Sequence, residues 1–557
     1  MASRRDELNA YSFARKRTNA AFLKPLPNGS IESAPKPLKA VVPSIIMGVL
    51  VLVGFGACGI IKPVAPQGWD TVGANVLVGD ESTTRYVVLP SHDANGNKTK
   101  LLHPVLNLAS AKLLLDPKKF QVLKIKESEL DGKLAHGPAI GIPYAPDRLP
   151  SASTVDKPKT WAVCDRPGTE ANGKTEQAVF VLDGKDKQLV DNTKKGKVDY
   201  NHALYVEDPD GARWLVDQRG FAFQMIADQL QGIKEARVGL KHFDTDEDRS
   251  LRQIIFGSEA EPQKVTADFM NTLVKSPLPI DMPVVDNAGR TPAVTDGLPA
   301  AARKIGSILE ASDGQKYVVE FNGVEKVSNF VAKILEQGKN AEKVNGGTGK
   351  ALDPVPVATG NIKHPILDSM NHPSTFRGSL PGNDLIPSPW PTEEVTAAND
   401  FAHGDQTGGL GAPTKNGVSC SVYKGTTTKY PGVDKLGFAN GVPDMGTWVG
   451  KDYPAKIAPG ATSYVTPGSG LLYRQVNNAA DKSGNLFLVT DTGLRYSIPS
   501  NNDSANKAGS DKQDIDQAQV HLGYGDAHPP LLLSAWSKLL NAGPQLNTHA
   551  ASQPQQS

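Results

Sequence analysis

The chain has 557 residues, of which 39% are hydrophobic and 21% are charged, and its formal net charge is +1. This length is several times that of an ordinary single domain, and the use of 53 Gly and 42 Pro favours many turns and short strands over long helices. Residues 1–39 carry a net charge of +5 and the rest is therefore mildly acidic, which argues against a nucleic-acid-binding protein, because the folded part of such a protein normally has a basic surface.

The first predicted element is a membrane-spanning helix over residues 40–61 (AVVPSIIMGVLVLVGFGACGII), a run without charge between Lys39 and Lys62. At about 1.5 Å of rise per residue, such a helix covers the roughly 30 Å hydrocarbon core of a bilayer. The flank before the run is far more basic than the flank after it. The positive-inside rule therefore places residues 1–39 in the cytoplasm and the large C-terminal part outside.

Two alternatives would also export the C-terminal part. A cleaved signal peptide normally has a shorter apolar core and a small-residue cleavage site, and residues 55–58 (FGAC) resemble, imperfectly, the lipidation site of bacterial lipoproteins. If the run stays in the membrane as a helix, Gly48, Gly54 and Gly56 would allow close packing against another membrane helix.

The cysteines provide a second constraint. Cys58 lies in the apolar run and is interpreted as a small buried residue. Cys164 and Cys420 lie in short strand-like segments on the exported side, where disulfides persist. We predict a disulfide between them that would close a loop of about 256 residues; two unpaired buried thiols are the alternative.

A strand-and-turn pattern recurs along the exported part. Each copy has a hydrophobic strand followed by Gly or Asn turn residues, and the four strands are residues 86–90 (YVVLP), 203–206 (ALYV), 316–321 (KYVVEF) and 485–489 (NLFLV). In two copies a segment with helical apolar spacing follows, at residues 106–115 and 327–335. The pattern predicts four repeats, and the two segments that each contain one Cys could pair into a central piece.

Several landmarks together resemble the EccB family. They are the basic segment 12–17 (SFARKR), the single anchor, Trp69, residues 102–115 (LHPVLNLASAKLLL), residues 141–146 (GIPYAP) and the two exported cysteines. EccB is the single-pass membrane component of the type VII (ESX) secretion system of actinobacteria. The resemblance covers nearly the whole chain, and residues 102–115 are its most specific part.

The resemblance implies a structural role on the outer face of the secretion machine. It implies an elongated periplasmic domain, self-association, contact with membrane lipid, and assembly with other Ecc proteins, namely the FtsK-like motor ATPase, EccD and EccE. The disulfide would then pin the central core of that domain.

Pattern and resemblance together predict an α+β protein with a single N-terminal transmembrane helix and an elongated extracytoplasmic domain of four α/β repeats around a central β-rich core. The expected order is a cytoplasmic basic segment (1–39), the transmembrane helix (40–61), a linker with repeat 1 (62–150), a core segment with Cys164 (151–199), repeat 2 (200–295), repeat 3 (296–395), a core segment with Cys420 (396–464), repeat 4 (465–545) and a disordered tail (546–557).

The chemistry-bearing patterns are weak. The family is sometimes described as having ATPase activity, and residues 345–351 (NGGTGKA) come nearest to a phosphate-binding loop. Val344 stands where the first Gly belongs, however, and Ala351 replaces the hydroxyl residue that binds magnesium. The acidic run 244–248 (DTDED) lacks the central Gly and the terminal Glu of a calcium loop.

We therefore expect no catalytic residue, no cofactor and no metal, and we interpret His103 as a packing residue. Two alternative functions stay open. One is nucleotide hydrolysis within the same complex. The other is binding of cell-wall material through grooves lined by Trp69, Trp161 or Trp214, although a buried core position is the usual state of a Trp.

Overall fold

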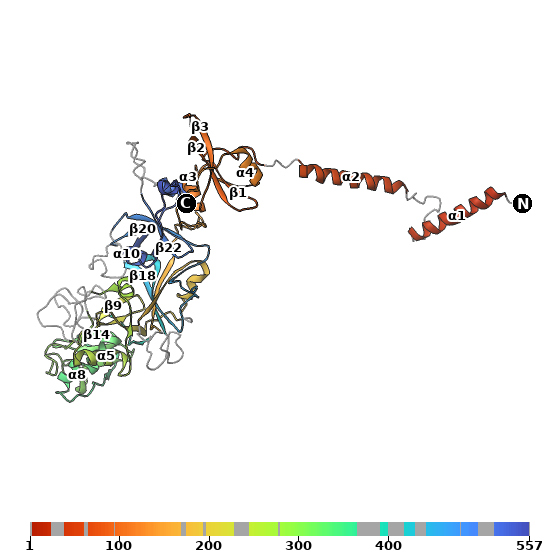
Figure 1. Ribbon diagram of the computed structural model, residues 1–557. Helices are drawn as coiled ribbons and strands as arrows, with labels where there is room; N and C mark the ends of the chain where they lie inside the picture. Colours follow the sequence, from red (N-terminus) through yellow and green to blue (C-terminus); the bar gives the residue numbers. More distant parts are fainter. Residues whose placement is uncertain are drawn as a thin grey trace.

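The structure is a computed structural model that describes residues 3–23, 38–60, 65–93, 95–168, 174–192, 196–227, 244–276, 279–364, 390–398, 417–428, 442–478, 481–499 and 517–555. Two helices, α1 (Arg4–Leu23) and α2 (Leu38–Ile60), stand apart from the part of the chain that holds all the sheets (Figure 1). That part is an elongated body with the first sheet at the end nearest α2 and helix α8 (Lys339–Val344) near the opposite end (Figure 1).

Helix α2 forms where the sequence predicts the anchor. Its described side chains, residues 41–53, are apolar apart from Ser44 and are exposed, and the large hydrophobic ones range from Val51 at 49% to Leu52 at 73%. Among the described residues, no helix is both long and apolar enough to cross a membrane. Gly48 has open space within 4 Å, whereas the surroundings of Gly54 and Gly56 lie outside what the structure describes.

Four sheets share one strand arrangement. The first has the order β3-β2-β1-β4, the second β10-β7-β8-β9-β11 with β16 also beside β7, the third β14-β13-β12-β15, and the fourth β23-β20-β21-β22-β24. In each, three consecutive strands form an antiparallel meander, and a later strand runs parallel to the first of them.

The strands of the first two sheets are β1 (Asn75–Gly79), β2 (Arg85–His92), β3 (Lys98–Pro104), β4 (Gln121–Ile125), β7 (His202–Glu207), β8 (Arg213–Val216), β9 (Phe221–Gln224), β10 (Gln263–Lys264), β11 (Val274–Lys275) and β16 (Thr396–Ala397). Those of the third and fourth are β12 (Ile308–Ala311), β13 (Lys316–Val319), β14 (Val324–Val327), β15 (Val355–Val357), β20 (Leu471–Val476), β21 (Asn485–Val489), β22 (Leu494–Ile498), β23 (Leu531–Leu533) and β24 (Asn541–Ala542).

Short helices accompany these sheets. They are α3 (Leu108–Leu114), α4 (Glu127–Lys133), α5 (Asp246–Phe256), α6 (Ala267–Thr272), α7 (Asn329–Gln337), α8, α9 (Gln517–His521), α10 (Ser534–Ser537) and α11 (Thr548–Ala551), with one-turn helices η2 (Gly184–Leu189), η4 (Ala300–Ala302) and η5 (Thr359–Asn361). Three of the glycines in the predicted turns, Gly96, Gly211 and Gly493, have φ of 80°, 85° and 79°, a left-handed conformation that other residues adopt only with strain.

A fifth, central sheet has the order β18-β17-β5-β6-β19. Its strands are β5 (Thr160–Arg166), β6 (Glu176–Leu182), β17 (Val418–Thr428), β18 (Val442–Gly450) and β19 (Ser463–Val465). The two Cys-containing segments of the sequence therefore do pair, as adjacent antiparallel strands.

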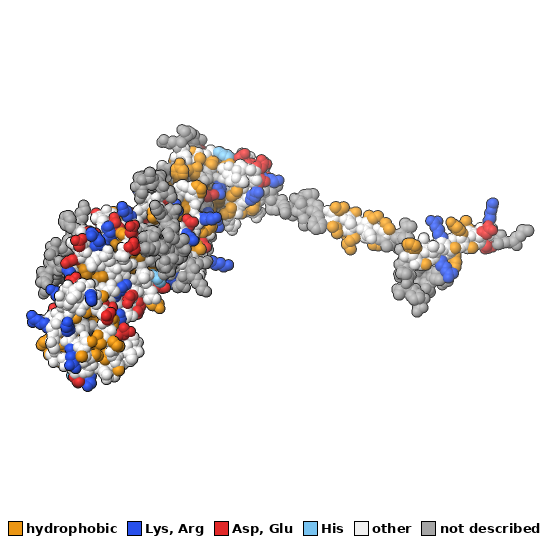
Figure 2. All heavy atoms as spheres, turned by 90° about the horizontal axis from the view of Figure 1, so that it is seen from below, with side chains coloured by type: hydrophobic (Ala, Val, Ile, Leu, Met, Phe, Trp, Pro, Cys, Tyr) orange, Lys and Arg blue, Asp and Glu red, His pale blue; other side chains and the backbone are white. Residues whose placement is uncertain are grey.

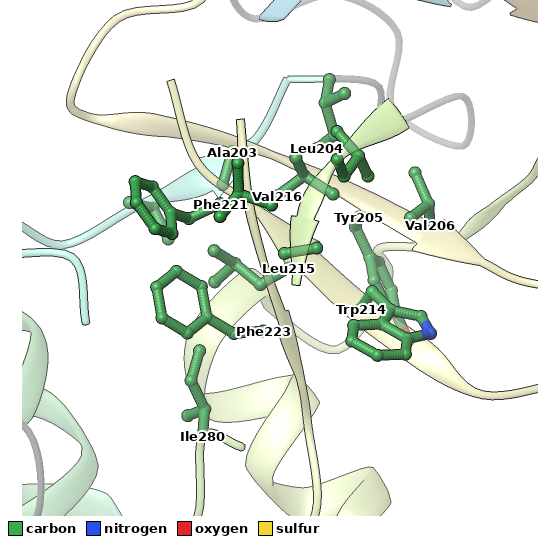
Figure 3. Packing of buried hydrophobic residues seen from close by; sticks show 14 of the residues in the cluster. Ala203, Leu204, Tyr205, Val206, Trp214, Leu215, Val216, Phe221, Phe223 and Ile280 are labelled. Carbon is green, nitrogen blue, oxygen red and sulfur yellow. The ribbon is translucent and has the colours of Figure 1, made fainter. Parts of the chain in front are cut away.

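One hydrophobic core runs through most of this body. It contains residues from the second, third, fourth and central sheets, among them Trp161, Trp214, Val318 and Tyr473. Figure 3 shows its second-sheet part, where the Trp214 ring of β8 lies beside Tyr205 of β7. Trp69, Trp161 and Trp214 are 5%, 0% and 1% exposed, so these three residues are core residues and do not line an open groove.

The repeat pattern read from the sequence is one strand out of phase in the second sheet. Residues 86–90, 316–319 and 485–489 lie in the second strands β2, β13 and β21, whereas residues 203–206 lie in β7, a first strand. The equivalent second strand is β8, which has only four residues. Because β7 and β8 are both short and buried, hydrophobicity alone does not distinguish them.

The acidic run at 244–248 begins a helix. Thr245 caps α5 by accepting a hydrogen bond from Asp248 N, and the Asp248 carboxylate accepts one from Thr245 N in return. Asp248 Oδ1 also accepts from Ala227 N at 2.7 Å. Acidic residues at this position also interact favourably with the helix dipole.

The prediction of a disordered tail over residues 546–557 is wrong for residues 546–555. Leu546 and Ala551 are fully buried, and helix α11 packs against α3 of the first sheet. Gln555 N donates to Ala139 O at 2.8 Å. The polar composition of the tail indicated disorder, but α11 packs on α3, which lies more than 400 positions earlier in the sequence.

Candidate functional site

The central sheet is built on the cross-strand pair of Cys164 in β5 and Cys420 in β17. The two residues lie directly opposite each other and form a disulfide across a sequence separation of 256. Both are fully buried. The bond therefore joins two distant segments at the middle of the sheet, as the sequence predicts.

Each face of the central sheet has a different neighbour. On the disulfide face, Phe180 and Trp448 pack with Tyr453 and Tyr464 from the segment before and within β19. On the other face, Trp161 lies 6.3 Å from the Tyr473 ring of the fourth sheet in an edge-on contact. The sheet is thus covered on both sides, which accounts for strands that are apolar at nearly every position.

A buried ion pair joins the central sheet to the start of the fourth. Lys159 is 1% exposed and its ammonium lies 2.5 Å from Asp183 Oδ2. Asp183 also accepts from Ser469 Oγ at 2.9 Å and from Gly184 N at 2.8 Å. Burial opposes the charge of this carboxylate, but the hydrogen bonds from Lys159 and Ser469 outweigh it and hold the pKa of Asp183 below its usual value.

Asp165 joins the central sheet to the second. Its carboxylate accepts from Thr266 N at 2.6 Å, at the start of α6, and from Gln177 Nε2 at 3.0 Å. Gln263 of β10 donates to Asp165 O and accepts from Ser419 of β17. Burial raises the pKa of Asp165 to about 6, because the loss of water outweighs the hydrogen bonds from Thr266 and Gln177, which lower it.

The motif at residues 102–115 forms the joint between the first and fourth sheets. Ala109 and Leu113 of α3 share a hydrophobic core with Leu486, Leu522 and other residues of the fourth unit. Lys112 Nζ donates to Leu522 O at 3.2 Å, and His521 Nδ1 donates to Leu115 O at 2.7 Å. The motif therefore serves to attach the sheet nearest α2 to the rest of the body.

The second landmark, residues 141–146, is held on the first turn of α3. Asn107 caps that helix by accepting from Ser110 N at 2.9 Å, and its amide donates to Ile142 O at 2.8 Å. Ile142 N donates to Ser110 Oγ at 2.8 Å. His103 Nδ1 lies 3.0 Å from Pro138 O, a contact that fits the packing role predicted for it.

The loop at 345–351 lies between helix α8 and strand β15. A phosphate-binding loop of the Walker type lies between a strand and a helix, with backbone N–H groups turned toward the phosphates. Here Gly346, Gly347 and Gly349 all have positive φ, and Asn345 Nδ2 donates to Lys350 O at 2.9 Å. The geometry is that of a glycine-rich turn leading into the last strand of a sheet.

One acidic group escaped the sequence analysis. Asp80, Glu81 and Glu127 have carboxylate oxygens within 4.8 Å of one another and form the one group in the described residues with the spacing of a cation site. Glu127 accepts from Ser82 N at 2.8 Å and from Glu81 N, and these backbone bonds lower the pKa of Glu127 to about 2. Glu127 lies 46 positions after Glu81 in the sequence, so no local motif marks the group.

One known protein family matches most of this chain. The family model described as type VII secretion system ESX-1, transport TM domain B, matches residues 1–376 and 443–557. This chain belongs to that family, EccB. The matched ranges leave out β17, although its Cys420 completes the disulfide.

Individual EccB proteins are distant relatives. The ESX-3 secretion system ATPase EccB3 of Mycolicibacterium smegmatis is 26% identical over 526 residues, which are 92% of this chain and 83% of the relative. The ESX-2 secretion system ATPase EccB2 of Mycobacterium tuberculosis is 24% identical over 348 residues, 61% of this chain and 60% of the relative.

Solved structures have the same fold. The EccB3 dimer from the ESX-3 core complex aligns with a TM-score of 0.51 at 21% identity and covers 86% of this chain and 99% of that chain. A chain of the intact ESX-5 inner membrane complex aligns with a TM-score of 0.51 at 19% identity, covering 100% of this chain and 96% of that one.

We predict that replacing both disulfide cysteines (Cys164→Ala with Cys420→Ala) lowers the free energy of unfolding by about 2–5 kcal/mol, because the disulfide restricts a long loop in the unfolded chain. Urea unfolding of the protein without reductant measures this. Dithiothreitol should lower the wild-type midpoint to that of the double variant and leave the variant unchanged. Equal midpoints for the two oxidised proteins would contradict the prediction.

Asp165 predicts a specific pH dependence. Its pKa is about 6 in the folded chain against an ordinary 3.8, so the folded state binds this proton more tightly than the unfolded state. Relative to Asp165→Asn, the wild type should therefore gain up to about 3 kcal/mol of stability as the pH falls from 7 to 4. Unfolding at several pH values tests this, with the exposed Asp210→Asn as control. A pH-independent difference would refute it.

Proposed function

We propose that this chain is a structural core component of a type VII secretion membrane complex and stabilises the assembly on its extracytoplasmic face. Membership of the EccB family supports this role. The similar structures come from ESX core and inner membrane complexes, which supports it as well. The observation that carries the proposal is the joined architecture, in which four sheets of one topology are fastened to a disulfide-linked central sheet. Such a body offers a large fixed surface for partners.

We further propose that residues 40–61 anchor the chain in the cell membrane as a single span. The run is uncharged, lies within and just beyond helix α2, and has exposed apolar side chains around the helix. A helix that is hydrophobic all round is normally buried in protein or in lipid. The basic flank supports a cytoplasmic N-terminus, and Gly48, Gly54 and Gly56 would be the closest points of approach to a neighbouring membrane helix.

The four sheets support a division into repeats. The first sheet lies within residues 62–150, the third within 296–395 and the fourth within 465–545, while the second takes its strand β16 from outside 200–295. We propose these ranges as four internal repeats, with residues 151–199 and 396–464 supplying the central sheet.

The expected partners are the other membrane components of the same system, namely the FtsK-like ATPase, EccD and EccE, together with further copies of this chain and membrane lipid. One of the similar structures is an EccB3 dimer, which supports self-association. On the face shown in Figure 2, acidic and basic side chains are interspersed over the sheet-bearing part. A surface of this kind favours specific protein contacts over binding to a single polyanion.

The alternative function is nucleotide hydrolysis. Several relatives are named secretion system ATPases. Hydrolysis would need a phosphate site, and residues 345–351 are the nearest candidate in the sequence. Their position after α8 and before β15 does not favour that role.

We predict that Lys350→Ala does not change the rate of magnesium-dependent ATP hydrolysis by the purified protein, because Lys350 sits in a turn without the strand–loop–helix geometry that binds phosphates. A coupled phosphate-release assay measures the rate, with Lys343→Ala, a neighbouring lysine of α8, as the matched control. Loss of turnover in Lys350→Ala alone would favour the hydrolase.

We predict that the chain, purified from membranes in mild detergent, brings the other Ecc components with it. The affinity tag belongs at the N-terminus, because Gln555 and Pro554 near the C-terminus contact Ala139 and Ile140. Mass spectrometry identifies the partners, and an untagged strain controls for background. Recovery of the tagged chain as a stable solitary protein would argue against the scaffold role.

A further inference from the structure

A polar hollow lies at one corner of the third sheet. Its volume is about 330 Å³, and it is formed where β13, β14, the first turn of α7 and the segment 392–393 meet. Most of its lining side chains are polar or aromatic, among them Asp313, Gln315, Tyr317, Lys326, Asn329 and Glu393. We refer to it as the β13–β14 hollow.

The lining combines one ring with hydrogen-bonding groups of both kinds. Tyr317 and Lys326 are direct cross-strand partners, so the ring and the lysine stem lie side by side. Asn329 Nδ2 donates to Glu393 Oε2 at 2.7 Å, which fixes that carboxylate at the start of α7. Burial and the nearby Asp313 raise the pKa of Tyr317, so its hydroxyl keeps its proton at neutral pH.

This set of groups selects against simple ions. An anion would meet the carboxylates of Asp313 and Glu393, and a cation would meet the ammonium of Lys326. A sugar hydroxyl both donates and accepts hydrogen bonds, so it can satisfy carboxylates, amides and an ammonium at once. The apolar face of a sugar ring also packs well on an aromatic ring.

The same corner of the first sheet is closed. There Tyr86 occupies the register position of Tyr317, since Tyr86 lies opposite Leu77 as Tyr317 lies opposite Leu309. Tyr86 packs edge-on against His136 at 5.8 Å. The hollow is therefore not a necessary result of the shared topology.

Charged side chains also close the corner of the first sheet. Arg85 bonds Asp147 at 2.7 Å, and Asp147 accepts from Leu108 N at the start of α3. In the third sheet Lys316, which stands where Arg85 stands, bonds Glu336 of α7 at 2.9 Å. Among the described residues no ring packs on Tyr317 in the way that His136 packs on Tyr86, so the third sheet leaves this corner open.

We propose that the β13–β14 hollow binds a neutral oligosaccharide, with a sugar ring against Tyr317 and its hydroxyls bonded to Asp313, Lys326 and Glu393. The size of the hollow, near the lower end of ordinary ligand sites at roughly 300 Å³, fits one or two sugar rings. This goes beyond the scaffold role and does not depend on it. It gives the exported body a contact with glycans outside the cell.

The test is a titration of the full-length protein in detergent with two probes, N,N′,N″-triacetylchitotriose and maltotriose, followed by saturation-transfer NMR. We expect at least one probe to bind with a Kd on the order of 1 mM or tighter and Tyr317→Ala to weaken it about tenfold or more. Phe321→Ala removes an exposed ring between β13 and β14 that does not line the hollow, and it should bind like the wild type.

Two further variants keep the test decisive if Tyr317→Ala does not fold. Glu393→Gln and Lys326→Ala change side chains that are half-buried and exposed, and each should weaken binding while the melting temperature stays at the wild-type value. The proposal is overturned if neither probe binds the wild type at millimolar concentration, or if the folded hollow variants bind as tightly as Phe321→Ala. Neither result would affect the co-purification of partners.

Discussion

The pairing of β5 with β17 is the contact on which the rest of the sheet-bearing body depends. All of the second and third sheets lie in the chain between these two strands, so the central sheet closes only after a segment of more than 200 residues has folded back. Closing a loop of that length is entropically unfavourable. The buried Cys164–Cys420 bond offsets part of this cost by restricting the unfolded chain. Once the strands are paired, both faces of the sheet are available, one for Phe180 and Trp448 and the other for the core shared with the remaining sheets.

A second closure brings the two ends of the exported part together. Helix α3 follows the first three strands, yet its partners are α9 and α11 at the far end of the chain. The first sheet, which comes directly after α2, therefore rests on the last one. This arrangement gives the specific motif at residues 102–115 a physical explanation, because its small and apolar residues must fit between two sheets. Residues 546–555 become ordered for the same reason, since α11 and Gln555 complete the joint.

Local signals of the sequence were sufficient for the elements and for the disulfide. The apolar periodicity of residues 327–335 predicted α7, and the glycine turns at Gly96, Gly211 and Gly493 marked strand ends correctly. What depended on distant partners was not predictable. The polar tail gave no sign of its contact with Ala139, and the polar joint of Asp165, Gln177 and Gln263 is assembled from three separate segments. The predicted position of the second repeat was wrong by one strand, because β7 and β8 have almost the same short apolar pattern.

Side chains with shifted pKa values often mark functional sites. In this chain, such groups at the joints between sheets must be distinguished from the polar groups of the β13–β14 hollow. The carboxylates of Asp165 and Asp183 are perturbed at joints between sheets, where each accepts hydrogen bonds from the neighbouring elements that it holds. Their role is accounted for by packing. The polar side chains of the β13–β14 hollow differ, because they gather at a corner that an equivalent sheet of the same chain closes with Arg85, Asp147 and His136. A repeated topology thus provides its own reference: a hollow at a corner that the first sheet closes and the third sheet leaves open is the better candidate for a ligand site.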